Sequence, residues 1–116
     1  MRTIGIIGGM GPAATIKMQQ QIFDATVAKN DQDHVPVITY SFPQMPDRTQ
    51  AILYGGQSPV PDLQRVAKVL EDGGASALLM PCNTAHYFIE DVRAAVSIPV
   101  IDMIEETAKF IFDTYD

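Results

Sequence analysis

The stretch TIGIIGGMGP, residues 3–12, decides the fold. Residues 3–8 form a continuous apolar run closed by glycines, which is typical of a strand buried on both faces of a parallel sheet. Pro12 fits the first turn of a helix, where its missing N–H group costs little. We therefore predict a strand, a glycine turn, and a helix that runs to about residue 29 with three apolar side chains inward: Ile16, Phe23 and Val27.

The same alternation of apolar runs and helical patterns continues along the chain. Further strands are predicted at 37–42, 76–80 and 98–101. A polar loop is expected at 30–34 and a helical turn near 51–54. Alternating buried strands and helices predict one α/β domain, residues 1–116, built on an open four-stranded parallel sheet with helices on both faces.

Three of the predicted helices follow these strands. Leu63, Val66, Ala67 and Leu70 lie at helical spacing, so residues 62–72 should form an amphipathic helix that ends at two glycines. The other two helices are expected to turn these side chains inward: Phe88, Val92, Ala95 and Val96 in one, and Ile104, Ala108, Ile111, Phe112 and Tyr115 in the last.

The composition limits the class of protein. Apolar residues make up 47% of the chain and charged residues 19%, as in a globular domain. The formal charge of −6 and the scattered basic residues argue against nucleic-acid binding, which needs clustered Lys and Arg. No apolar segment approaches a membrane span, and the single cysteine, Cys82, cannot form an internal disulfide. We expect a cytoplasmic protein without membrane contact.

Three unusual loops each follow a predicted strand: GGMGP at 8–12, PQMPDRT at 43–49 and PCNTAH at 81–86. In an open parallel sheet, ligands bind beyond the carboxyl ends of the strands. Because all three loops should lie at that edge, the sequence predicts a pocket formed by them together.

The first loop allows two interpretations. Residues 9–14 formally match the dinucleotide fingerprint G-x-G-x-x-A, but Pro12 alters the turn, and the strand at 37–42 does not end in an acidic residue for a ribose. The glycines could serve only a tight strand-to-helix turn. Alternatively, backbone N–H groups at the start of the helix could hold a small carboxylate.

The other two loops contain the candidate reactive side chains. Arg48 could anchor a carboxylate in bidentate fashion or form a surface pair with Asp47. Cys82 could be an inert buried thiol, or a thiolate favoured by the positive end of the following helix. Asn83 and Thr84 could bind a carboxylate or cap that helix.

His86 has four possible roles, namely base, metal ligand, orienting group or structural histidine. Without further Cys or well-spaced His residues, Cys82 and His86 make a poor metal site. We therefore predict no metal site in this chain.

Together, IGIIGGMGP (4–12), PQMPDRT (43–49) and MPCNTAH (80–86) resemble the cofactor-independent aspartate/glutamate racemase family, and its aspartate racemase branch in particular. The likeness extends over essentially all 116 residues, because the motifs recur in the same order and spacing. The segment IPVIDMIEETA (98–108) also resembles the end of that family's first half.

The resemblance implies an amino-acid racemase that interconverts L- and D-aspartate with two cysteines, one from each half, and without pyridoxal phosphate, metal or nucleotide. By motif position, Cys82 is the first proton-transfer group. The positions that match the family's substrate contacts and pocket wall are Met10, Arg48, Asn83, Thr84 and Ala85. Supporting roles fall to Gly9, Gly11 and His86.

The family's second cysteine, usually in a GCTE-like motif, does not occur in these 116 residues. We therefore expect the chain to supply only the first thiol and to racemise very poorly alone. The carboxyl-terminal half or a second copy in a homodimer would be its partner. A function of another class stays open, a stand-alone module that binds a small dicarboxylate or amino acid without turnover.

Overall fold

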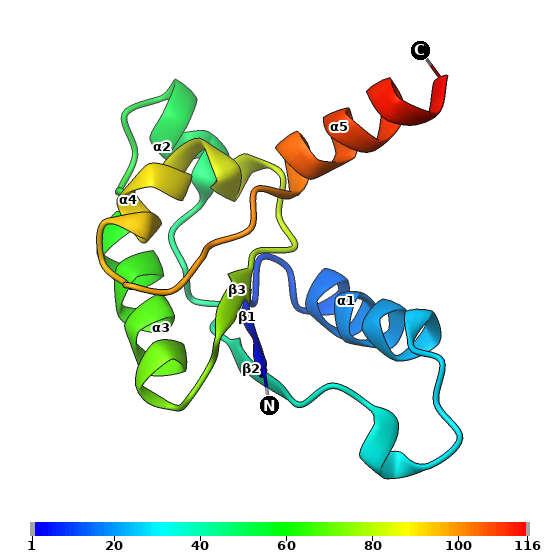
Figure 1. The fold of residues 1–116 in the computed structure, drawn as a ribbon. Helices are drawn as coiled ribbons and strands as arrows, with labels where there is room; N and C mark the ends of the chain where they lie inside the picture. Colours follow the sequence, from blue (N-terminus) through cyan, green and yellow to red (C-terminus); the bar gives the residue numbers. More distant parts are fainter. Residues whose placement is uncertain (1, 116) are drawn as a thin grey trace.

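The structure, a computed structural model, describes residues 2–115 and contains a three-stranded parallel sheet. The strands are β1 (Ile4–Gly8), β2 (Val37–Ser41) and β3 (Ala77–Leu79), in the order β2-β1-β3 (Figure 1). The glycine-closed run that opens the chain is therefore the central strand.

The prediction of a fourth strand at 98–101 is wrong. This segment makes a single parallel bridge, from Val100 to Leu78. Leu78 donates a hydrogen bond to the carbonyl of Pro99 and accepts one from the N–H of Ile101. Residue 99 would be the preceding donor in this ladder, but proline has no N–H group, so the pairing does not extend toward residue 97. On the other side, the N–H of Met103 donates to His86 instead.

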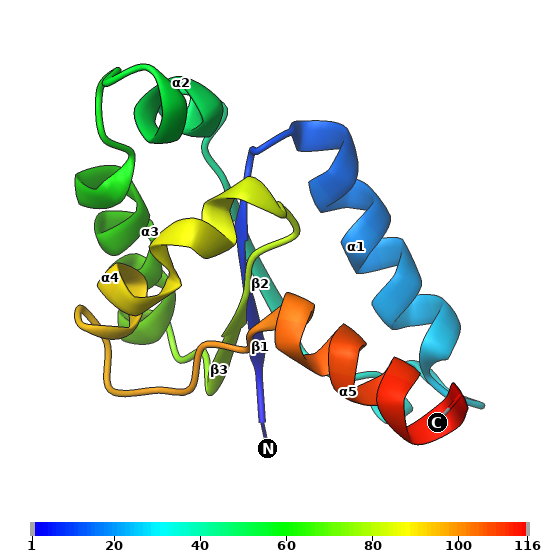
Figure 2. The ribbon, with the colours of Figure 1, turned by 90° about the horizontal axis from the view of Figure 1, so that it is seen from above.

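The helices lie on both faces of the sheet, as predicted. Figure 2 shows α1 and α5 on one side of the strands and α2, α3 and α4 on the other. The helices are α1 (Pro12–Ala25), α2 (Arg48–Leu53), α3 (Val60–Asp72), α4 (Ile89–Arg93) and α5 (Met103–Tyr115), with 3₁₀ turns η1 (Asp31–Asp33) and η2 (Thr84–Phe88). None of the helices within residues 2–115 combines the length and the apolar character that crossing a bilayer would require.

The main core lies between the sheet and α3. The four apolar residues predicted on one face of this helix are all buried there: Leu63, Val66, Ala67 and Leu70. They form one cluster with Ile7 of β1 and Leu78 of β3. Phe88 and Val92 belong to the same cluster, as expected, although the helix predicted after Cys82 begins as the 3₁₀ turn η2 and its α-helical part, α4, is short.

The predicted inward face of α1 is wrong. Ile16, Phe23 and Val27 are 72%, 57% and 99% exposed, and the helix ends at Ala25. The buried residue of this helix is Thr15, which faces Gly8 so closely that a Cβ on Gly8 would lie 2.4 Å from Thr15 Cγ2. Because successive helical residues are about 100° apart, this contact turns Ile16 away from the sheet.

The polar loop predicted at 30–34 is present, whereas the inward face predicted for the final helix is wrong. The segment at 30–34 contains a 3₁₀ turn closed by a capping box between Asn30 and Asp33. The final helix forms as predicted, but Ile104, Ile111 and Phe112 are more than half exposed. The side chain of Tyr115, predicted on the same face, lies outside the described part of the chain.

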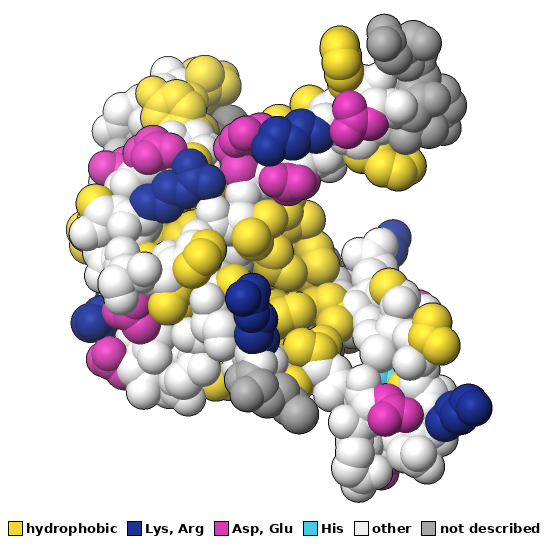
Figure 3. Space-filling view, in the orientation of Figure 1, with side chains coloured by type: hydrophobic (Ala, Val, Ile, Leu, Met, Phe, Trp, Pro, Cys, Tyr) yellow, Lys and Arg dark blue, Asp and Glu magenta, His cyan; other side chains and the backbone are white. Residues whose placement is uncertain are grey.

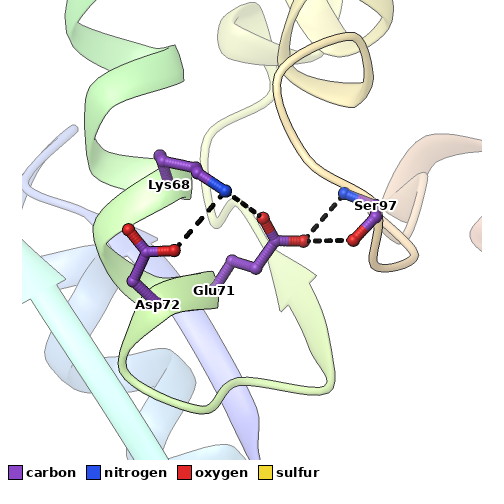
Figure 4. A network of polar contacts seen from close by, with 4 residues as sticks. All are labelled: Lys68, Glu71, Asp72 and Ser97. Carbon is purple, nitrogen blue, oxygen red and sulfur yellow. Dashed lines mark hydrogen bonds and ion pairs between the residues drawn. The ribbon is translucent and has the colours of Figure 1, made fainter.

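A polar network ties the end of α3 to the loop before Val100 (Figure 4). One oxygen of Glu71 accepts from Lys68 Nζ at 2.9 Å, and the other accepts from the N–H and hydroxyl of Ser97 at 2.8 and 2.7 Å. These donors, Lys68 first, lower the pKa of Glu71 from 4.5 to about 2. The contacts in the folded protein therefore favour the charged form of the Glu71 carboxylate.

We expect Glu71→Gln to reduce the loss of stability on acidification. The unfolded carboxyl takes up a proton near pH 4.5 and the folded one only near pH 2, so acid in this window favours unfolding. The stabilisation that comes from the charged Glu71 carboxylate is fully present above pH 4.5 and disappears as the pH falls through about 2. Urea midpoints at neutral pH and at about pH 3 measure it.

Glu90→Gln is the matched control, because Glu90 also forms an ion pair, with Arg93, but its side chain is 80% exposed. Its midpoints should follow those of the parent protein at both pH values. A Glu71→Gln protein with the same acid sensitivity as the parent would contradict the network's role.

Candidate functional site

The three loops predicted to form a pocket do lie at one edge of the sheet. Parallel pairing aligns Gly8 with Ser41 and Ile6 with Leu79, so β1, β2 and β3 all end at that edge. The N–H of Phe42 donates to the carbonyl of Gly8 at 3.1 Å, which joins the first two loops directly.

The first loop has a structural reason for its glycines. Gly9 has φ +99°, and a Cβ there would lie within 2.6 Å of the Phe42 backbone. Its N–H donates to the Thr15 hydroxyl at 2.9 Å, and that hydroxyl donates to the carbonyl of Gly11 at 3.0 Å. These contacts favour the tight-turn interpretation, and Thr15 is a supporting residue that the sequence patterns did not reveal.

Cys82 lies in an open cavity at this edge. Its thiol is half-buried, and Sγ lies 3.4 Å from the hydroxyl oxygen of Thr84. The cavity measures about 290 Å³, and Cys82 and Asn83 line it together. The helix that follows is only the five-residue turn η2, and the side chain of Asn83 does not cap it. The polar partner that the structure gives the thiol is therefore a hydroxyl rather than a helix end.

Helix α1 forms the opposite side of this cavity. The sequence patterns missed its contribution, which consists of Ala14, Lys17, Met18 and Gln21. These four positions follow the helical spacing i, i+3, i+4 and i+7, and that spacing was the available signal. Lys17 brings a cation to the cavity, and Met103 closes it at the start of α5.

His86 is a structural clamp. The Met103 N–H donates to Nε2 at 3.2 Å, so Nδ1 of the neutral ring carries the proton and donates to the carbonyl of Cys82 at 2.8 Å. The side chain is buried and ties the thiol loop to α5. Within residues 2–115, His86 does not belong to any cluster of three potential metal ligands.

Arg48 begins α2, which lies against η2. Its NH1 donates to the carbonyls of Met45 at 3.3 Å and Pro46 at 3.0 Å, and its buried Nε has no hydrogen-bond partner in the described chain. The expected alternative, a pair with Asp47, is not observed, because that carboxylate caps α2 by accepting from the Gln50 N–H.

Two other predicted contacts, Met10 and Ala85, are buried. Met10 is 5% exposed, Ala85 is fully buried, and both side chains belong to the apolar core. Ala85 could therefore reach a ligand only through its backbone. Arg48 and Met10 lie at the same sheet edge as Cys82 but are not among the residues that line its cavity.

Comparisons with known proteins identify the family of this chain. The family described as Asp/Glu/hydantoin racemase matches residues 7–111. The chain belongs to this racemase family. The broad specificity amino-acid racemase RacX of Bacillus subtilis is 31% identical over 119 aligned positions, which cover 93% of this chain and 48% of RacX.

Two solved structures of the racemase family superpose well. The aspartate racemase of Picrophilus torridus matches with a TM-score of 0.92 and 36% identity, over 99% of this chain and 49% of that one. An aspartate racemase homologue from Pyrococcus horikoshii matches with a TM-score of 0.82 and 26% identity, over 99% of this chain and 50% of that one. The chain thus spans about half the length of these relatives.

We expect Thr15→Val to destabilise this racemase domain by about 1–3 kcal/mol, because the buried Gly9 N–H would lose its hydrogen-bond acceptor. Denaturant unfolding measures the change. Thr49→Val is the control, since Thr49 is exposed on α2 and its substitution should change stability little. Equal effects of the two substitutions would contradict the role assigned to Thr15.

We expect His86→Ala to loosen the thiol loop and the start of α5, with a loss of about 1–3 kcal/mol from two partly buried partners left unpaired. Amide hydrogen exchange should accelerate at Met103. His34→Ala is the control, because His34 stacks on Phe23 and makes neither of these contacts. Unchanged exchange at Met103 would argue against the clamp.

Proposed function

We propose that this chain is the amino-terminal half of a cytoplasmic, cofactor-independent amino-acid racemase that interconverts L- and D-aspartate. The observation that carries the proposal is the position of Cys82. In a domain of this racemase family, its thiol lies in an open cavity beyond the ends of parallel strands.

Cys82 is the proposed acid/base on one face of the substrate. Its thiolate takes the α-proton, which forms an S–H bond and leaves the electron pair of the broken C–H bond on the α-carbon. A second thiol then gives a proton to the opposite face of that carbon. A base held close to the α-carbon, together with stabilisation of the developing negative charge, makes this transfer feasible.

Two of the proposed carboxylate contacts follow Cys82 in the chain, and Arg48 lies at the same edge of the sheet. Asn83 and Thr84 are exposed beside Cys82, and Arg48 begins the helix that lies against η2. Within residues 2–115, Arg48 does not form an ion pair, which leaves its charge available for a carboxylate. Ala85 contributes through its backbone, Met10 supports the pocket wall, and an acidic amino acid suits these donors.

The second thiol comes from outside residues 1–116 in this proposal, because Cys82 is their only cysteine. Its source is the carboxyl-terminal half of a longer racemase, in line with relatives of about twice this length. Residues 1–116 alone therefore lack the second proton donor and are expected to be inactive or nearly so.

We expect Cys82→Ser in the complete enzyme to lower the racemisation rate of aspartate by about 10²–10⁴-fold, the usual contribution of a general acid–base group. In heavy water, the variant should also lose exchange of the α-proton from one enantiomer and keep it from the other. Proton NMR of each enantiomer measures this exchange, and calorimetry with aspartate checks that binding survives.

Equal exchange rates for the two enantiomers in the Cys82→Ser enzyme would contradict a one-face role for this thiol. Aspartate binding without turnover in the unmodified complete protein would favour the binding-module alternative instead.

A further inference from the structure

The cavity at Cys82 contains a positive charge that the proposed carboxylate contacts do not include. Lys17 lines it from α1, and Cys82 and Asn83 line it from the loop at 81–86. The other lining side chains are uncharged: Ala14, Met18, Gln21, Pro81 and Met103. Among the described residues, Lys17 is therefore the cation that shares this cavity with the thiol, whereas Arg48 lies outside the lining.

The charge of Lys17 is available to a ligand. Opposite charges on a helix pair when they are three or four positions apart, and these positions around Lys17 hold Ala13, Ala14, Gln20 and Gln21. Within residues 2–115, the Lys17 ammonium does not form an ion pair with another element either. Because the side chain is exposed at the cavity, an anion reaches it without displacing an internal partner.

The surroundings of the cavity favour an ion pair. Helix α1 and the start of α5 border the cavity, and Figure 3 shows a hollow between these two helices with a largely hydrophobic surface. Apolar walls reduce the screening of charges by water, so an ammonium group beside them attracts a carboxylate more strongly than one on an open surface. Met18 and Met103 contribute such walls to the cavity itself.

The two sides of the cavity match the two ends of an acidic amino acid. In the proposed reaction, the α-carbon lies at the Cys82 thiol, and Asn83 and Thr84 hold the α-carboxylate beside it. The loop with these residues forms one side of the cavity, and α1 forms the opposite side. A substrate side chain that extends away from the loop therefore meets Lys17, whose charge complements a second carboxylate.

We propose that Lys17 binds the side-chain carboxylate of the substrate and thereby selects acidic amino acids over neutral ones. This inference rests on the proposed function, because it assigns the substrate class of the same site. An ammonium group on a flexible four-carbon stem is a point charge that can follow a carboxylate over a range of positions. Lys17 therefore discriminates by charge more than by side-chain length, and aspartate and glutamate both satisfy it.

Lys17→Met in the complete enzyme tests this role, because methionine keeps much of the side-chain length and removes the charge. We expect the affinity for aspartate, measured by calorimetry, to fall about tenfold, a loss between that of an exposed ion pair and that of a buried charged hydrogen bond. The KM for aspartate should rise more than kcat falls. The affinity for asparagine, which has the shape of aspartate without the second charge, should stay nearly unchanged.

Two further variants control for effects other than the charge at this position. Lys29→Met is the matched control, because Lys29 is exposed and does not line the cavity. It should bind aspartate as tightly as the parent enzyme does. Lys17→Arg keeps the positive charge and should retain most of the affinity for aspartate. Where asparagine binds too weakly for a measurement, Lys17→Arg decides instead, since a loss as large as that of Lys17→Met would overturn a role for the charge.

Unchanged aspartate affinity in the Lys17→Met enzyme would overturn the inference. Equal losses for aspartate and asparagine would overturn it as well, because they would indicate a general disturbance of the cavity. Calorimetry detects binding without turnover. Aspartate binding that depends on Lys17, in a protein that does not racemise aspartate, would therefore contradict only the proposed reaction. Racemisation by the Lys17→Met enzyme with the KM of the parent would contradict only the role of Lys17.

Discussion

The contact between the end of the central strand and the helix that follows it controls the rest of the structure. Gly8 leaves room for Thr15, and the Thr15 hydroxyl accepts the Gly9 N–H and donates to the carbonyl of Gly11. This contact sets the rotation of α1 about its axis. With Thr15 toward the sheet, Lys17 and Met18 face the thiol loop and form one side of its cavity.

The thiol loop is positioned by a second buried polar group. His86 uses one ring nitrogen for the Cys82 carbonyl and the other for the Met103 N–H, so both nitrogens are occupied in the neutral ring. A histidine held in this way orients its neighbours and is not free to act as a base. In the proposed racemase, proton transfer therefore falls to Cys82, which lines the cavity and packs against the core while only partly buried.

The cavity at Cys82 and one face of the sheet are both incompletely covered. The cavity is open, and the sheet face between α1 and α5 keeps apolar side chains partly exposed. In the proposed racemase, a second half would supply the other thiol at this cavity.

Local patterns in the sequence determined the strands β1, β2 and β3, the buried face of α3, and the edge at which Cys82 and Arg48 lie. These features follow from hydrophobic periodicity and from the shared direction of parallel strands, which are local properties of the chain. Family motifs added the racemase assignment. In the proposed mechanism, the single cysteine of residues 1–116 means that the second thiol comes from elsewhere.

Tertiary structure alone decided the remaining features, because each depends on contacts between distant residues. The segment at 98–101 stays a single bridge because Pro99 cannot donate toward β3 and the Met103 N–H donates to His86 instead. The rotation of α1 depends on the Gly8–Thr15 contact, which overrides the apolar pattern of Ile16 and Phe23. Which ring nitrogen of His86 donates and which accepts depends on the Cys82 carbonyl and the Met103 N–H, which only the folded chain brings together.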